Sequence, residues 1–138
     1  MNYLIDTNAI SELKRKRPEP SVLAWVSERP AASLYLSVIS LGEIRKGVES
    51  VTDIRKKSQL LDWLENDLHN FFADRILPID ASTADRWGVL LANTKRPIPA
   101  IDSLLAATAS THNLTFVTRN TKDLQGLEIP LLNPWLNG

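Results

Sequence analysis

Three acidic side chains lie where an α/β protein could gather them at one site. Asp6 follows an apolar run at the start of the chain, Glu43 follows a second run, and Asp102 begins a later helical pattern. A carboxylate at the end of a buried strand is unfavourable unless it is paired, hydrogen-bonded or bound to a cation. Oxygen ligands without Cys or His favour Mg²⁺ or Mn²⁺ over zinc. The pattern therefore predicts a divalent-metal site with Asp6, Glu43 and Asp102 as its ligands.

A fourth polar segment, Asn120 with Asp123 three residues later, would join this site if the first and last long strands are neighbours. Each residue also has a simpler interpretation. Ser40-x-x-Glu43 has the form of a capping box, Asp102 could complement a helix dipole, and Asn120-x-x-Asp123 is typical of helix capping. Three acids gathered together would nevertheless raise one another's pKa unless a cation neutralised them, which favours the metal site.

A magnesium site of this kind could hydrolyse phosphodiester bonds. Magnesium held by carboxylates can activate water and stabilise charge on a phosphoryl oxygen. Arg45, Lys46 and Arg119 are candidates to hold a nucleic-acid backbone beside the acids. The 16 Lys and Arg residues balance 16 Asp and Glu residues, so net charge gives no support for nucleic-acid binding. Clumped basic residues are most often solvated helix faces.

Alternating apolar runs and helical spacings predict the elements that position these residues. The predicted strands cover residues 3–6, 34–38, 76–80 and 114–118, with a short fifth at 129–132. Predicted helices cover 9–13, 20–28, 52–72, 82–92 and 101–112, and another begins near residue 40. This alternation implies right-handed crossovers and helices on both faces of the sheet. We predict a single three-layer α/β/α domain over residues 1–138, with a mainly parallel sheet.

The composition excludes several classes of site and targeting signal. The chain has no cysteine, which excludes disulfides, thiolate metal ligands and cysteine nucleophiles and fits a reducing cytoplasm. His69 and His112 lack close metal-ligand spacing. The sequence shows no signal-peptide pattern and no apolar run near the roughly 20 residues of a membrane helix. We therefore expect a cytoplasmic protein without membrane association.

Two other enzyme classes share the predicted alternation. A receiver domain needs a phospho-accepting Asp after its third strand, which Asp80 could supply, but the adjacent acid pair after the first strand is missing. An aspartyl phosphatase needs a second Asp two residues after the first, where this chain has Asn8. Both classes are therefore disfavoured.

Four segments, in this order along the chain, resemble the motifs of PIN domains. They are Leu4–Asn8, Ser40–Gly47, Ile101–Ala109 and Thr118–Asn120. Within that family the chain is most similar to the VapC toxins of type II toxin–antitoxin systems, especially the FitB-like branch, which the closing Leu132–Trp135 also resembles. The likeness runs from one end of the chain to the other.

The resemblance implies a PIN-like Mg²⁺- or Mn²⁺-dependent endoribonuclease, toxic when free and silenced by an antitoxin. The implied catalytic residues are Asp6, Glu43, Asp102 and Asn120, and the implied supporting residues are Thr7, Thr118 and Asp123. Many relatives carry Asp at the fourth position. Asn120 keeps an oxygen ligand there but removes a charge, which bears on whether a second metal ion is held.

The resemblance also implies partners. Such toxins pair as homodimers and form higher-order complexes with a VapB/FitA-like antitoxin, whose C-terminal segment enters the active-site groove. An antitoxin Arg could pair there with the carboxylates and displace metal. The helix at 20–28 and the apolar stripe at 52–72 are candidate antitoxin clamps, unless they only pack the core. The alternative function is a catalytically weak PIN-like module that acts mainly through protein binding, and no base-reading motif indicates which RNA would be cut.

Overall fold

The fold is built on a five-stranded parallel sheet with the order β3-β2-β1-β4-β5. The computed structural model describes residues 1–136, so the last two residues of the predicted 1–138 domain lie outside the described residues. The strands are β1 (Tyr3–Ile5), β2 (Leu34–Ser37), β3 (Ile76–Leu77), β4 (Thr115–Val117) and β5 (Leu131–Leu132). The parallel pairing of β1 with β4 fulfils the condition on which the predicted site depends.

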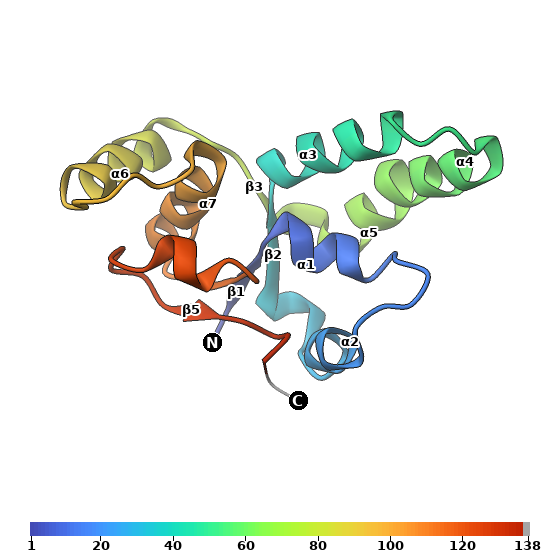
Figure 1. The fold of residues 1–138 in the computed structure, drawn as a ribbon, viewed down its shortest axis with the longest axis horizontal. Coiled ribbons are helices and arrows are strands. Elements are labelled where there is room, and N and C mark those ends of the chain that lie inside the picture. Colours follow the sequence, from blue (N-terminus) through green and yellow to red (C-terminus); the bar gives the residue numbers. More distant parts are fainter. Residues whose placement is uncertain (137–138) are drawn as a thin grey trace.

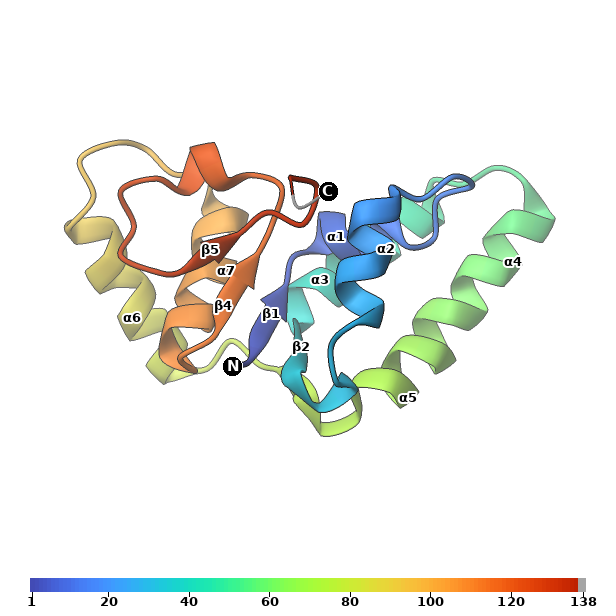
Figure 2. The same cartoon turned by 90° about the horizontal axis from the view of Figure 1, so that it is seen from below.

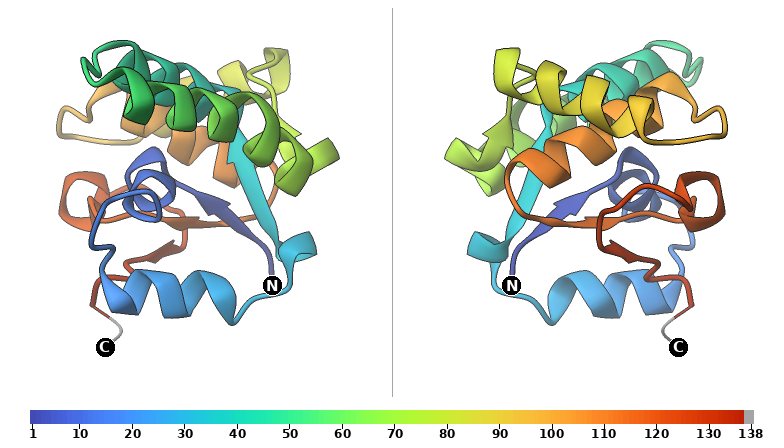
Figure 3. Two further views of the ribbon diagram at one scale, coloured as in Figure 1. Left: turned by 90° about the vertical axis from the view of Figure 1, so that its right-hand side faces the viewer. Right: turned by 90° about the vertical axis from the view of Figure 1, so that its left-hand side faces the viewer.

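Helices cover both faces of this sheet (Figures 1 and 2). The α-helices are α1 (Thr7–Glu12), α2 (Pro20–Ser27), α3 (Val38–Glu49), α4 (Ile54–Asp62), α5 (Leu68–Phe72), α6 (Ala81–Ala92) and α7 (Ala100–Thr111). Shorter helical segments are η1 (Ala31–Ser33), η2 (Trp63–Asp67), η3 (Ala73–Arg75) and η4 (Thr121–Leu124). Helix α1 lies between α2 and α3 (Figures 1 and 3). None of the helices in residues 1–136 is long and apolar enough to cross a membrane.

The alternation of side chains along the two central strands divides the core into two layers. Ile5 of β1 is paired with Val117 of β4, and both pack against helices α1 to α5 on one face. Leu4 and Phe116, the preceding pair, point the other way and pack against α6 and α7. All four side chains are fully buried. Because consecutive residues face opposite layers, the strand that ends before Asp6 is fixed in register from both sides.

The predicted three-layer α/β/α fold is confirmed, although several elements differ in their bounds. The predicted strand at 76–80 is paired only over Ile76–Leu77, where it forms the edge strand β3. Pro78 ends the pairing because it has no backbone N–H to donate to the neighbouring strand. The predicted helix at 52–72 is helical from Ile54 onward but contains the π-helical turn η2. The π-helical turn contains one residue more than a regular turn, so the residues after it face a different direction than a continuous α-helix would give. No feature of the sequence predicts this turn.

Candidate active site

Asp6 occupies the carboxyl end of β1 and is the N-cap of α1. Its backbone N–H continues the ladder to the Val117 carbonyl at 2.8 Å, which fixes the position of the side chain. The carboxylate is 3% exposed. One oxygen accepts the Thr7 N–H at 2.7 Å, and the other accepts the Thr118 hydroxyl at 2.6 Å. Asp6 is therefore a buried, rigidly held carboxylate at the edge of the sheet.

Burial raises the pKa of Asp6 from 3.8 to about 6, although the hydrogen bonds from Thr118 and Thr7 act in the opposite direction. The negative charges of Asp102 and Glu43 raise this pKa further. None of the ion pairs within residues 1–136 involves Asp6. The fold thus keeps a carboxylate in a place that disfavours its charge.

Glu43 comes to the same place from α3. The Thr7 hydroxyl hydrogen-bonds to Glu43 Oε1 and lies 2.8 Å from the Ser40 hydroxyl. A hydroxyl carries one proton and a carboxylate only accepts, so Thr7 donates to Glu43 and the buried Ser40 is left to donate to Thr7. Thr7 therefore links α1 to α3 and holds the Glu43 carboxylate beside Asp6.

The capping box proposed for Ser40 and Glu43 is wrong. Helix α3 begins three residues earlier, and its N-cap is Ser37, whose hydroxyl accepts the Ile39 N–H at 3.0 Å. Ser40 is inside the helix and fully buried. Its role in the Thr7–Glu43 contact was missed, although a buried Ser one turn before an acid was a usable signal.

Asp102 lies in the first turn of α7, as predicted, and is partly buried. Burial raises its pKa, and the negative charges of Asp123 and Glu43 add to the increase. Asp123 lies in η4, directly after β4. Four acids from four segments therefore influence one another electrostatically at one edge of the sheet.

Asn120 enters the site through its backbone. Its N–H donates to the Thr118 hydroxyl at 3.0 Å, and that hydroxyl donates to Asp6. The Asn120 side chain makes no capping bond to η4, so the interpretation of Asn120-x-x-Asp123 as a side-chain cap is not supported. Thr118, predicted only as a supporting residue, makes the buried contact that orients Asp6.

The acids have the chemistry of a divalent-cation site but do not enclose an ion. Their donor atoms are carboxylate oxygens, which suit Mg²⁺ or Mn²⁺, and a bound cation would remove the unfavourable burial of the Asp6 charge. Within residues 1–136, no group of three or more His, Cys, Asp or Glu side chains is arranged to hold a metal ion. Enclosing one requires a change of side-chain rotamer. Asp102 can make it most readily, because no hydrogen bond in the described part of the chain holds its carboxylate.

The three basic residues predicted to contact nucleic acid differ in how far other side chains of this chain already engage them. Arg45 is paired with Glu49 at 3.2 Å and with Glu65 at 3.0 Å. The Arg119 guanidinium lies 5.1 Å from the centre of the Trp135 ring. Lys46 is exposed on α3 and takes part in none of the ion pairs of residues 1–136. A role for these three residues in binding nucleic acid stays a prediction.

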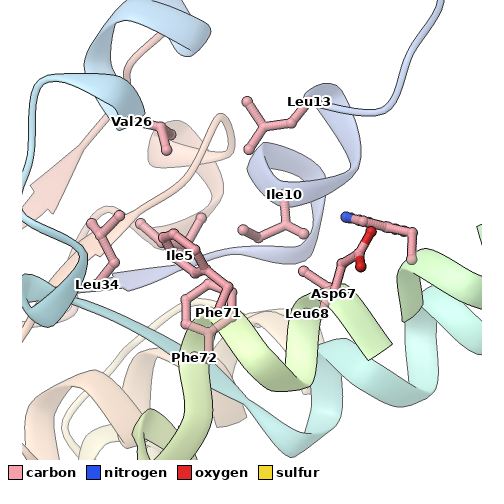
Figure 4. A pocket seen from close by; sticks show the side chains of 10 residues that line it. Ile5, Ile10, Leu13, Val26, Leu34, Asp67, Leu68, Phe71 and Phe72 are labelled. Atoms are coloured by element: carbon pink, nitrogen blue, oxygen red, sulfur yellow. The ribbon is translucent and has the colours of Figure 1, made fainter. Parts of the chain in front are cut away.

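A separate apolar groove of about 270 Å³ lies on the face covered by α1 and α2 (Figure 4). Its lining comes from the sheet, from α1 with its C-cap, and from the two segments predicted as clamps. The residues are Ile5, Ile10, Leu13, Val26, Leu34, Trp63, Asp67, Leu68, Phe71 and Phe72. Phe72 is buried and Phe71 is 44% exposed, so the predicted clamp segments both pack the core and leave an apolar surface open.

The family model of the PIN domain matches residues 3–126 of this chain. Toxin FitB of Neisseria gonorrhoeae is 37% identical over 135 residues, covering 96% of this chain and 97% of the relative. VapC ribonuclease Y4jK of Sinorhizobium fredii is 32% identical, with 96% of each covered. A crystal structure of FitAcB from Neisseria gonorrhoeae has a TM-score of 0.93 at 36% identity, covering 97% of this chain and 99% of that one.

The chain therefore belongs to the PIN-domain family, in the branch that contains the VapC ribonucleases and the FitB toxin.

Proposed function

We propose that this protein is a Mg²⁺- or Mn²⁺-dependent endoribonuclease and the toxin of a type II toxin–antitoxin system, acting in the cytoplasm. The observation that carries the proposal is the buried Asp6 carboxylate, which has a raised pKa, two acidic neighbours and no cationic partner in residues 1–136. A buried carboxylate with a purely structural role is typically paired with a Lys or Arg, whereas a cation-binding carboxylate is kept free of them. The family and the names of the relatives supply the RNA substrate.

In this proposal Asp6, Glu43 and Asp102 hold the cation. When bound, the cation would stabilise charge on the phosphoryl oxygens and lower the pKa of the attacking water. The protein's own contribution is positioning. The hydroxyls of Thr118 and Thr7 each fix one carboxylate, so that the charges of Asp6 and Glu43 face the same space.

The Asn120 backbone is linked to Asp6 through the Thr118 hydroxyl, and the charge of Asp123 acts on Asp102. An amide in place of a fourth acid leaves less negative charge for a second cation, so we expect one tightly held ion. Asp123 can supply an additional carboxylate, because its charge already raises the pKa of Asp102. A second ion would therefore be weak and would depend on Asp123.

The apolar groove is the proposed docking site of a VapB/FitA-like antitoxin. The solved structures of FitAcB from Neisseria gonorrhoeae and of FitAB bound to a DNA fragment are similar to this chain and support such a partner. The groove suits a segment with apolar side chains, and Asp67 at its wall suits a basic residue of that segment. A homodimer, with higher-order complexes formed on antitoxin binding, completes the proposed assembly.

The test is cleavage of RNA by the purified chain in the presence and absence of Mg²⁺, with Asp6→Asn as the inactive variant. We expect Mg²⁺-dependent cleavage by the parent and its loss in Asp6→Asn, with growth inhibition lost in parallel. Asp80→Asn is the matched control, because Asp80 is also a helix N-cap aspartate but lies at α6, away from the acids. Equal cleavage by the parent and Asp6→Asn would contradict the proposal.

The alternative, a catalytically weak module that acts by protein binding, makes a different prediction. A module of that kind has no need for metal, so Glu43→Gln would leave the affinity for Mn²⁺ unchanged. The amide keeps an oxygen to accept the Thr7 hydroxyl, so the variant removes charge and retains the contact. In the nuclease we expect the affinity for Mn²⁺ to fall by about tenfold or more.

A further inference from the structure

A second groove, distinct from the apolar one, runs between α1, α3 and α4 and has Glu43 in its wall. Its volume is about 240 Å³, and its lining includes Lys14, Arg15 and Lys56. A neighbouring hollow of about 340 Å³ shares Lys14 and Lys56 and adds Lys16. The two hollows form one basic groove that adjoins the acidic site through Glu43.

The positive charge of this basic groove is available to a ligand. Lys14, Lys16 and Lys56 are exposed, and none of them takes part in an ion pair within residues 1–136. The nearby Lys57, by contrast, is paired with Glu49 at 3.3 Å. Uncompensated lysines at a concave surface create a positive potential that attracts an anion to the groove.

Two further features fit a chain-like anion that carries flat bases. The Lys14 ammonium lies 5.6 Å from the centre of the Trp63 ring, which itself lines the groove. Gly47, also in the lining, lies within the last turn of α3, and a Cβ at this position would meet no atom within 4 Å. Glycine weakens a helix relative to alanine, and no packing within this chain requires it here. It leaves room for a close approach from outside.

We propose that the basic groove binds the sugar–phosphate backbone of single-stranded RNA on one side of the bond that is cut, with Lys14 and Lys56 contacting phosphates. This inference rests on the proposed ribonuclease function. It identifies the surface along which the RNA strand extends from the active site. Basic grooves with an aromatic wall are the common means of holding a single strand. Helix α1 separates Asp6 from the start of the basic run and advances about 9 Å over its six residues. That distance places the lysines beyond the reacting phosphate.

The experiment measures binding of a fluorescein-labelled single-stranded RNA of mixed sequence by anisotropy, in EDTA so that no cleavage occurs. The parent protein is compared with the double variant Lys14→Ala/Lys56→Ala over a series of salt concentrations. Loss of two phosphate contacts lowers the slope of log K against log salt by about 1.4, and the affinity at 0.1 M salt by about 25-fold. Thermal unfolding of each variant checks that the fold is retained.

The matched control is Arg17→Ala/Arg55→Ala. It removes the same charge from the same two segments, and both arginines are exposed and line neither hollow. We expect its salt slope to stay close to that of the parent. Equal losses in the two double variants would mean that net charge alone matters, and this result would overturn the proposed path.

Cleavage assays separate the path from the function on which it rests. Mg²⁺-dependent cleavage by the parent with unchanged RNA affinity in Lys14→Ala/Lys56→Ala would overturn the path and leave the nuclease intact. A parent that neither binds nor cleaves RNA would overturn both. If the double variant lost affinity for the antitoxin while its affinity for RNA stayed the same, the groove would be a protein-binding surface and the proposed path would be wrong.

Discussion

Replacing Asp6 by Asn should make the metal-free protein more stable at neutral pH, although it should abolish activity. Burial raises the pKa of Asp6 from 3.8 to about 6, so the folded protein holds this carboxylate in an unfavourable charged form at pH 8. Asn has nearly the same shape and no charge. Under the proposed function, the fold gives up stability at this position to keep a cation ligand available.

The magnitude follows from the two pKa values. Below pH 3.8 the carboxyl group is protonated in both states, and it contributes no difference in stability. Between pH 3.8 and about 6 the unfolded chain releases a proton that the folded protein retains, so stability falls by about 1.4 kcal/mol per pH unit. Above pH 6 the deficit is constant at about 3 kcal/mol, which corresponds to roughly 10 °C in Tm for a chain of this length.

The assay is thermal and urea unfolding of the parent and Asp6→Asn in EDTA at pH 8 and pH 4. We expect the variant to be more stable by about 3 kcal/mol at pH 8 and by less than about 1 kcal/mol at pH 4. Adding Mg²⁺ should raise the Tm of the parent and leave that of Asp6→Asn unchanged, since only the folded parent binds the ion.

Asp80→Asn provides a control of opposite sign. Asp80 is also an N-cap, but hydrogen bonds from the Thr83 backbone N–H and hydroxyl lower its pKa. Its charge therefore stabilises the fold above the unfolded pKa, and the Asn variant should be less stable at pH 8. The reasoning would be refuted if Asp6→Asn were no more stable than the parent at pH 8. It would also be refuted if the gain in stability were as large at pH 4 as at pH 8.

Three other changes have predicted outcomes. Gly47→Ala should raise the free energy of unfolding by about 1 kcal/mol, measured in urea, because its Cβ meets no atom and alanine favours the helix; a loss would reveal a packing role. Phe72→Ala should lower the same quantity by about 3–5 kcal/mol, since the ring is 1% exposed, and a loss under 1 kcal/mol would place it outside the core. The affinity for Mg²⁺ should fall as the pH drops below about 6, because protons then compete with the ion for Asp6, whereas an affinity unchanged between pH 7 and pH 5 would contradict its role as a ligand.

The alternation of strands and helices could be predicted from the sequence because the apolar runs are short, dense and well separated. The neighbouring position of β1 and β4 could be stated only as a condition, because strand order depends on contacts between residues more than a hundred positions apart. That condition brings Thr118 to Asp6. The acids were therefore identifiable as candidates, and the hydroxyls that orient them were less so.

Errors of detail came from local signals that compete. Ser37 and Ser40 both precede helical residues, and Ser40 has an acid three positions later, which made it the better capping candidate in sequence. Helix α3 begins at Val38 because β2 ends at Ser37, so Ser40 is inside the helix and free to contact Thr7. The point at which β2 ends therefore determines which serine is the N-cap of α3.

The basic residues show the same dependence on tertiary structure. Arg45 and Lys46 adjoin Glu43 in sequence, yet Arg45 is committed to two carboxylates. Lys14 belongs to a basic run that is typical of a solvated segment in sequence. In the fold, α3 and α4 pack beside α1, so Lys14 lines the same groove as Glu43. Proximity along the chain was a poor guide to proximity in space.

Diffraction from crystals of the protein soaked in Mn²⁺, recorded at a wavelength where manganese scatters anomalously, tests most directly whether the acids form a cation site. If the site binds a divalent ion, an anomalous peak will lie within about 2.0–2.3 Å of carboxylate oxygens of Asp6 and Asp102, with Glu43 bound directly or through water. The same soak of Asp6→Asn crystals should show no peak there. Crystals of the parent with no peak at these acids, or with a peak only elsewhere, would contradict the proposed metal site.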